Sequence, residues 1–164
     1  MGHHHLDTLD KRILSLIADD ARMPFLEVAR ACNVSGAAIH QRIQKLTNLG
    51  IIKGSQFTLD PESIGFETCA FIGLHLNDPL KSDEVVKKLK DIPEIAACYC
   101  PTGQYDLFVK VYAYNNQHLT NIIREQLQPL GLSGSETMIT LTTPFDRQLP
   151  VSMMKVDDES EPYE

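Results

Sequence analysis

Apolar residues recur at helical spacing three times within the first 60 residues of the chain. One stripe predicts a helix over residues 7–19 and consists of Leu9, Ile13, Leu16 and Ile17. Two shorter stripes predict a helix with Pro24 in its first turn and another over residues 35–48, capped by the hydroxyl of Ser35. Residues 51–59 are expected to form a short β-hairpin. Three helices followed by a two-stranded wing are typical of a winged helix-turn-helix.

From residue 69 onward, segments with strand-like alternation enclose two further helical stripes. The predicted strands cover residues 69–77, 95–99, 105–112 and 136–142, and the helices lie around Val85–Ile92 and Leu119–Leu130. This β-α-β-β-α-β order predicts an α+β chain whose second half is a ferredoxin-like antiparallel sheet with both helices on one face. The other face, which carries Phe71, Phe108 and Tyr112, is then bare. An exposed apolar sheet face predicts at least a dimer.

The 164 residues are enough for two small domains. We predict an N-terminal domain over residues 6–60, a linker over 61–67, a sheet domain over 68–150 and an acidic tail over 151–164. The histidine run at residues 3–5 is either native or a tag remnant and is left out of the fold prediction. No apolar run approaches the roughly 20 residues of a membrane-spanning helix, and no signal-peptide pattern is present, so a cytoplasmic location is expected.

The net charge of −7 is unfavourable for nucleic-acid binding until it is divided along the chain. Residues 1–60 hold 7 Lys/Arg against 6 Asp/Glu, whereas the remainder holds 8 against 16. Between Val28 and Leu59 there is no acid at all. The basic residues of this segment are Arg30, Arg42, Lys45 and Lys53. The pattern therefore predicts a modest basic surface on an otherwise acidic protein.

The exposed side of the third predicted helix carries the candidate DNA contacts. Small residues at its start permit close approach to a major groove, and its polar side chains are able to bond base edges or phosphates. The candidates are Ser35, Gly36, Ala37, His40, Gln41, Arg42, Lys45 and, in the wing, Lys53. Arg42 has two interpretations, because it could reach a phosphate or pair with an acid such as Asp10. The alternative for the whole segment is a module that only packs and presents a solvated polar face.

No pattern of metal ligands or catalytic residues stands out. The four cysteines, Cys32, Cys69, Cys98 and Cys100, form no C-x-x-C pair and have no histidine at ligand spacing. We interpret them as buried packing residues, with a redox or metal role as the alternative. Nucleophile motifs, glycine-rich phosphate loops and H-E-x-x-H are absent, so we expect no cofactor and no metal. The His3–His5 run could bind a metal, although an expression or surface origin is the simpler reading.

From Leu6 to Thr143 the chain resembles the Lrp/AsnC family, the leucine-responsive or feast/famine regulators. The motif Leu6-Asp7-x-x-Asp10-x-x-Ile13-Leu14 is followed by Asp20-Ala21-Arg22 and Val34-Ser35-x-x-x-Ile39-x-x-Arg42-Ile43. In the second half, Gly103-Gln104-Tyr105-Asp106 matches the G-x-Y-D signature of the family. Ser135 departs from the threonine usual before the last strand.

This resemblance implies a winged helix-turn-helix joined to a ligand-binding RAM domain that holds amino acids or related effectors between subunits. It also implies homodimers on double-stranded DNA, assembling up to octamers. The implied effector residues are Gly103, Tyr105, Asp106, Ser135 and Thr137. Asp106 could accept an α-ammonium group, while Gly103 permits close backbone approach. The alternative is that this glycine and this aspartate only fix a turn.

The resulting prediction is a sequence-specific transcription regulator, not an enzyme, whose oligomerisation and DNA binding respond to a small effector. One alternative is an enzyme that resembles the sirohaem decarboxylases, which share this architecture. Such a site needs clustered His, Arg and Tyr, whereas His75 and His118 have no obvious arginine partner. Another alternative is a metabolite-binding module without DNA binding, against which Arg42 and Lys45 argue.

Overall fold

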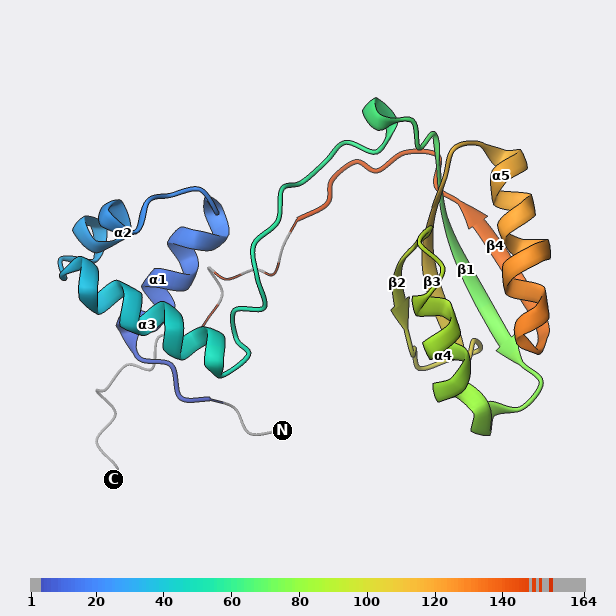
Figure 1. Cartoon of the computed structure of the whole chain (residues 1–164), viewed down its shortest axis with the longest axis horizontal. Helices are drawn as coiled ribbons and strands as arrows, with labels where there is room; N and C mark the ends of the chain where they lie inside the picture. Colours follow the sequence, from blue (N-terminus) through green and yellow to red (C-terminus); the bar gives the residue numbers. More distant parts are fainter. Residues whose placement is uncertain (1–3, 148, 150, 152–153, 155–164) are drawn as a thin grey trace, which may run out of the picture. The chain divides into compact units, whose positions relative to one another are not determined.

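The computed structural model describes residues 4–147, 149, 151 and 154. The chain forms two compact units, shown in Figure 1. The first comprises the described residues up to Thr58 and from Asp146 onward, and the second runs from Leu59 to Phe145. His3 and most of the predicted acidic tail lie outside the described residues. None of the described helices is long and apolar enough to cross a membrane.

Three helices build the first unit: α1 (Thr8–Asp19), α2 (Phe25–Cys32) and α3 (Gly36–Asn48). They enclose a small core whose fully buried members are Ile13, Val28, Ala29 and Ile39. The Ser35 hydroxyl accepts a hydrogen bond from the Ala38 N–H at 3.2 Å, as expected for the cap of α3. Pro24 lies one position outside the first turn of α2, because its ψ of 138° keeps it extended. The three predicted helices are therefore confirmed, with a shift at Pro24.

The predicted hairpin is wrong, since residues 51–59 contain no strand. Phe57 and Leu59 are 69% and 65% exposed, so the segment buries little apolar surface. An isolated two-stranded ribbon is at best marginally stable in water, which explains why this segment does not form a hairpin by itself. The Arg22 guanidinium instead lies 4.6 Å from the centre of the Phe57 ring. From Lys53 onward this segment is an exposed, extended arm, whereas Ile51 and Ile52 are half-buried.

The second unit contains a four-stranded antiparallel sheet: β1 (Thr68–Leu76), β2 (Ile95–Tyr99), β3 (Leu107–Ala113) and β4 (Leu132–Ile139). Its strand order, β2-β3-β1-β4, is that of the predicted ferredoxin-like fold. The last strand begins at Leu132 rather than near residue 136. Gly131, with a φ of +83°, turns the chain directly into it, and Gly134 pairs with His75 inside it.

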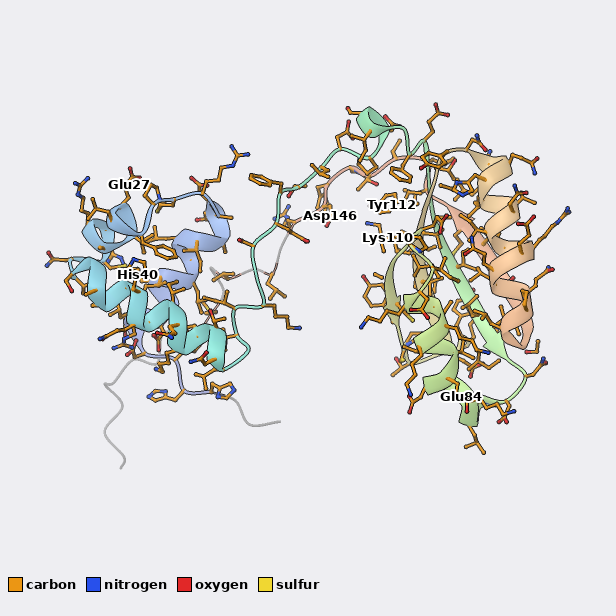
Figure 2. The ribbon with its side chains drawn as sticks, viewed as in Figure 1. Glu27, His40, Glu84, Lys110, Tyr112 and Asp146 are labelled. Carbon is orange, nitrogen blue, oxygen red and sulfur yellow. The ribbon has the colours of Figure 1, made fainter. Side chains whose placement is uncertain are left out.

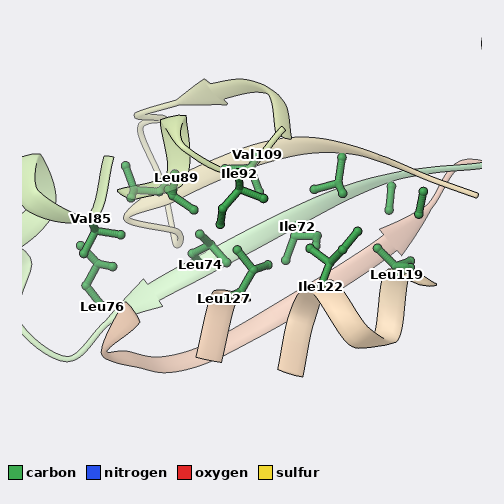
Figure 3. Packing of buried hydrophobic residues seen from close by; sticks show 14 residues of the cluster. Ile72, Leu74, Leu76, Val85, Leu89, Ile92, Val109, Leu119, Ile122 and Leu127 are labelled. Atoms are coloured by element: carbon green, nitrogen blue, oxygen red, sulfur yellow. The ribbon is translucent and has the colours of Figure 1, made fainter. Parts of the chain in front are cut away.

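Both helical segments of this unit pack on the same face of the sheet, around the core in Figure 3. The first is α4 (Ser82–Lys90). The second starts as α5 (Asn116–Asn121), widens into a π-helical stretch (Ile122–Leu127) and closes with a 3₁₀ turn (Gln128–Leu130). The apolar stripe of this segment predicts a continuous helix around Leu119–Leu130. The wider turns precede Pro129, which lacks an N–H and crowds the preceding turn, so regular α-helical bonding does not continue to the end.

The opposite face of the sheet is aromatic, and no helix of this unit covers it. Phe71 and Phe108 stack with ring centres 5.7 Å apart. Lys110 of β3 extends its ammonium group over Phe71 at 5.9 Å and over Tyr112 at 5.2 Å. Lys110 and Tyr112 are labelled in Figure 2. The predicted division into a helix-covered face and a bare aromatic face is therefore confirmed.

Candidate DNA-binding and effector sites

Helix α3 presents an acid-free surface. Between Gly36 and Asn48 it contains no aspartate or glutamate, and Ile39 and Leu46 anchor it in the core. Ala37, His40 and Gln41 are exposed, and a Cβ added at Gly36 would meet no atom within 4 Å. The His40 ring, labelled in Figure 2, lies edge-on to Phe25 with centres 5.0 Å apart. The start of α3 is therefore small, open and free of negative charge.

Two of the candidate DNA contacts are engaged with acids of the same unit. The Arg42 guanidinium donates to Asp10 at 3.0 Å and also to Asp7, while the Lys45 ammonium lies 3.2 Å from the other oxygen of Asp10. Asp10 is fully buried, whereas the Lys45 side chain is 48% exposed. Of the two interpretations of Arg42, the chain by itself adopts the ion pair.

The electrostatics of this cluster follow from its hydrogen bonds. The pKa of Asp7 is lowered, first because its carboxylate accepts the Asp10 backbone N–H at 2.8 Å and then because Arg42 and Lys45 stabilise its negative charge. The pKa of Arg42 is raised by its bonds to Asp7 and Asp10. Sequence reasoning named Asp10 as a partner of Arg42 but missed Asp7, which caps α1 and also pairs with Arg42.

The eight candidate DNA residues differ in whether their side chains are engaged within the chain or exposed to solvent. Ser35 uses its hydroxyl as a cap and Arg42 is tied to acids, whereas the remaining positions of α3 are more open. Lys45 is both paired and half in solvent. Lys53 is exposed, on the extended arm that replaces the predicted wing.

In the second unit, the loop before β3 is fixed mainly by Asp106. Its carboxylate accepts the Leu76 N–H at 2.8 Å, and its own N–H donates to the Leu74 carbonyl at 3.0 Å. These two bonds join the start of β3 to the end of β1. Gly103 has a φ of +131°, a conformation that side-chain-bearing residues rarely adopt. The turn-fixing alternative for Asp106 is the arrangement that the chain adopts.

Tyr105 lies on the bare face of the sheet, directly over Gly73 of β1. Its hydroxyl donates to the carboxylate of Glu136 on β4, and its ring lies 5.3 Å from that of His75. The bond to Glu136 is the main reason why the pKa of Tyr105 is raised. Sequence reasoning missed both Gly73 and Glu136. The available signal was a glycine in the middle of a strand, which often marks close approach of another group.

Ser135 and Thr137 lie on β4 opposite the buried residues Leu74 and Ile72. Since directly opposed residues point to the same side of a sheet, both are on the helix-covered side, although they are exposed. Glu136, between them, points to the other side with Tyr105. The single chain therefore does not bring its five candidate effector residues onto one surface.

The two histidines weighed for an enzyme have separate environments. His75 lies beside Tyr105, whereas His118 accepts the Tyr114 N–H at 3.2 Å and lies 3.4 Å from Glu94. No group of three or more His, Cys, Asp or Glu suited to a metal occurs in the described part of the chain. The cysteines are free thiols, and none of them is fully buried as expected. Cys32, Cys69 and Cys98 are half-buried, and Cys100, which follows the end of β2, is exposed.

Comparison with known proteins agrees with this pair of units. Residues 6–53 match the winged helix-turn-helix DNA-binding family, and residues 69–150 match the Lrp/AsnC ligand binding domain. A helix-turn-helix joined to a ligand-binding domain defines a DNA-binding transcription regulator.

The full-length relatives identify the family. The regulatory protein AsnC of Haemophilus influenzae is 33% identical over 147 residues, covering 89% of this chain and 98% of that protein. The structure of Escherichia coli AsnC is 29% identical with a TM-score of 0.82, covering 89% of this chain and 99% of that one. A Neisseria meningitidis transcriptional regulator, solved with L-Met, has the same fold at 20% identity and a TM-score of 0.83, covering 90% and 98%. The chain belongs to the Lrp/AsnC family of transcription regulators.

Proposed function

We propose that this regulator reads a specific DNA sequence with the exposed start of α3 and that an amino acid or related small molecule controls its assembly and DNA affinity. The observation that carries the DNA-reading part is the acid-free surface of α3. Its small first residues suit close approach to a major groove, and Gln41 offers an amide able to pair with adenine.

In this proposal, the basic residues hold the phosphate backbone while His40 and Gln41 contact base edges. Lys45 and Lys53 are exposed enough to reach phosphates. Arg42 acts indirectly, because its pairs with Asp7 and Asp10 hold α3 against α1. The proposed list of direct contacts therefore keeps the sequence candidates except Ser35 and Arg42.

The effector part of the proposal rests on the second unit. The Neisseria meningitidis regulator, which shares this fold, was solved with L-Met. The loop that contains Gly103 and Tyr105 lies at the border of the bare aromatic face, where a second copy would pack. We propose that two copies meet through this face, that the effector binds near the loop, and that dimers assemble further, up to octamers. An effector then acts by favouring one assembly, and thus one spacing of DNA-binding units.

The same proposal assigns no catalytic activity and a cytoplasmic location. His75 and His118 have unrelated neighbours, and each contacts an aromatic ring, so they support packing roles better than a shared reaction centre. We retain domain boundaries of 6–60 and 68–150 with a linker at 61–67. An enzymatic alternative would need a tetrapyrrole site, and a binding experiment with haem is its direct test.

A footprint on the DNA upstream of the protein's own coding sequence, repeated with each common L-amino acid, tests the proposal. We expect a protected site whose extent or affinity changes with at least one amino acid. Protection that no amino acid changes would remove the effector part alone. The absence of sequence-specific protection would remove the DNA-reading part.

A further inference from the structure

The contact between Tyr105 and Glu136 connects the loop before β3 with β4, and β3 and β4 are not neighbours in the sheet. In the order β2-β3-β1-β4, strand β1 lies between β3, which follows Tyr105, and β4, which carries Glu136. Gly73 of β1 is opposite Phe108 on one side and Glu136 on the other. The Tyr105 ring crosses β1 at this position, and any Cβ at residue 73 would overlap it. The glycine therefore provides the path by which the phenol reaches the carboxylate.

Of the two acids near the loop, Glu136 is the more exposed to solvent. Asp106 is partly buried and already accepts the Leu76 N–H. Glu136 is exposed, and within the described residues the Tyr105 hydroxyl is its hydrogen-bond partner. A carboxylate offers about four lone-pair sites, of which one phenol occupies one. Most of the acceptor capacity of Glu136 therefore faces the solvent on the bare side of the sheet.

The Tyr105 phenol, which bonds Glu136 in the single chain, is a weaker hydrogen-bond partner for a carboxylate than a cation would be. The Tyr105 phenol is neutral and has one donor, and its pKa is raised chiefly by its bond to Glu136. A primary ammonium has three donors and a full positive charge. Hydrogen bonds in which both partners are charged are among the strongest in proteins. An ammonium group arriving from solvent is therefore able to replace the phenol.

We propose that Glu136, rather than Asp106, binds the α-ammonium of the amino-acid effector, and that the Tyr105 hydroxyl holds this place until the effector displaces it. The inference deepens the effector part of the proposed function and depends on it. Release of Tyr105 also frees its ring from Gly73 and Phe108, which lie on the face assigned to the second copy. Effector binding thereby changes the surface through which copies assemble.

Isothermal titration calorimetry on the full chain tests this inference. The wild type is first titrated with each common L-amino acid, and the tightest binder is then compared with its analogue lacking the amino group. Glu136→Gln should weaken amino-acid binding by about tenfold or more, because a charged hydrogen bond contributes about 1.5–3 kcal/mol. Tyr105→Phe should tighten binding by about two- to tenfold, because it removes the competing hydroxyl. Glu125→Gln, at an exposed acid of the π-helical stretch, is the matched control and should leave binding unchanged.

The outcomes separate this inference from the function on which it rests. Wild-type affinity in Glu136→Gln would overturn the assignment of Glu136. Weaker binding in Tyr105→Phe would mean that the hydroxyl contacts the effector, which overturns its role as a placeholder. If the wild type gives no heat with any amino acid, the effector part of the proposed function fails, and this inference with it. A thermal melt of each variant shows whether a loss of binding is a loss of fold.

Discussion

The two units of this chain use their acidic side chains in opposite ways. In the helical unit, Asp10 is fully buried and holds Arg42 and Lys45 of α3, the helix that we propose reads DNA. In the sheet unit, Glu136 is exposed and bonds a neutral phenol. A buried acid with two cations is expensive to disturb and suits a fixed scaffold. An exposed acid with a neutral partner exchanges that partner at a small cost in free energy and suits a site that responds to a ligand.

The largest effect is expected at the buried acid. Asp10→Asn removes the buried carboxylate that Lys45 bonds and that Arg42 shares with Asp7, and should destabilise the helical unit by about 3 kcal/mol. Amide hydrogen exchange in α1–α3 measures this loss directly. Asp19→Asn, at an exposed acid at the end of the same helix, is the control and should have little effect. Equal protection in the two variants would show that the buried cluster does not hold α3.

The next effect concerns the surface of α3. Replacing Gln41 and Lys45 together by alanine should abolish operator binding, because it removes a base contact worth about 1–3 kcal/mol of discrimination at Gln41 and a phosphate contact at Lys45. Gel shifts measure the affinity, and sedimentation should show the same oligomer as the wild type. The matched control replaces Gln128 and Arg124 by alanine on the sheet unit. Sequence-specific binding retained by the α3 variant would mean that another surface reads the DNA.

A smaller effect is expected where Tyr105 crosses the sheet. Gly73→Ala places a methyl group against the Tyr105 ring and should destabilise the sheet unit by about 1–3 kcal/mol through overpacking. Adding Tyr105→Ala should recover most of this loss in a thermal melt. Gly36→Ala, where the new methyl meets open space, is the control. Failure of the second substitution to restore stability would place the strain elsewhere.

The smallest effects are expected in the pH dependence of stability, which differs between the two units. Asp7 has a lowered pKa, so its contribution to stability is present at neutral pH and is lost as the pH falls through and below its ordinary 3.8. Tyr105 has a raised pKa, so its contribution is present below its ordinary 10.0 and is lost as the pH rises above that value. Asp7→Asn should flatten only the acidic limb of a stability profile, and Tyr105→Phe only the alkaline limb. An effect of Asp7→Asn on the alkaline limb, or of Tyr105→Phe on the acidic limb, would contradict the Asp7–Arg42 and Tyr105–Glu136 contacts.

Much of the fold could be predicted because periodicity alone determines which positions are buried. The alternation around Ile72 and Leu74 identified the core face of β1, and the stripe through Ile39 identified the buried side of α3. Periodicity gave no reliable prediction at residues 51–59, where the expected hairpin contains no strand. It also missed the early start of β4, because a glycine at residue 134 gives no apolar signal.

The sites were harder to predict, because they depend on contacts between residues far apart in sequence. Asp7 and Arg42 are 35 positions apart, and Tyr105 and Glu136 are 31 apart. A motif identifies Asp106 as important but does not distinguish a ligand contact from the strand-joining bond to Leu76. The sequence did suggest Asp10 as a partner of Arg42. It also carried an unused signal at Gly73, because an interior strand glycine suggests that another group approaches closely.

The central claim is that this acidic chain binds a specific DNA sequence through the basic surface of its helical unit. The most direct test is a salt titration of its affinity for the footprinted upstream site and for a scrambled duplex of the same length. The account predicts that both affinities fall steeply and linearly on logarithmic axes, because phosphate contacts release counterions, while the upstream site remains the tighter at every salt concentration. A salt-independent affinity, or equal binding of the two duplexes, would contradict it.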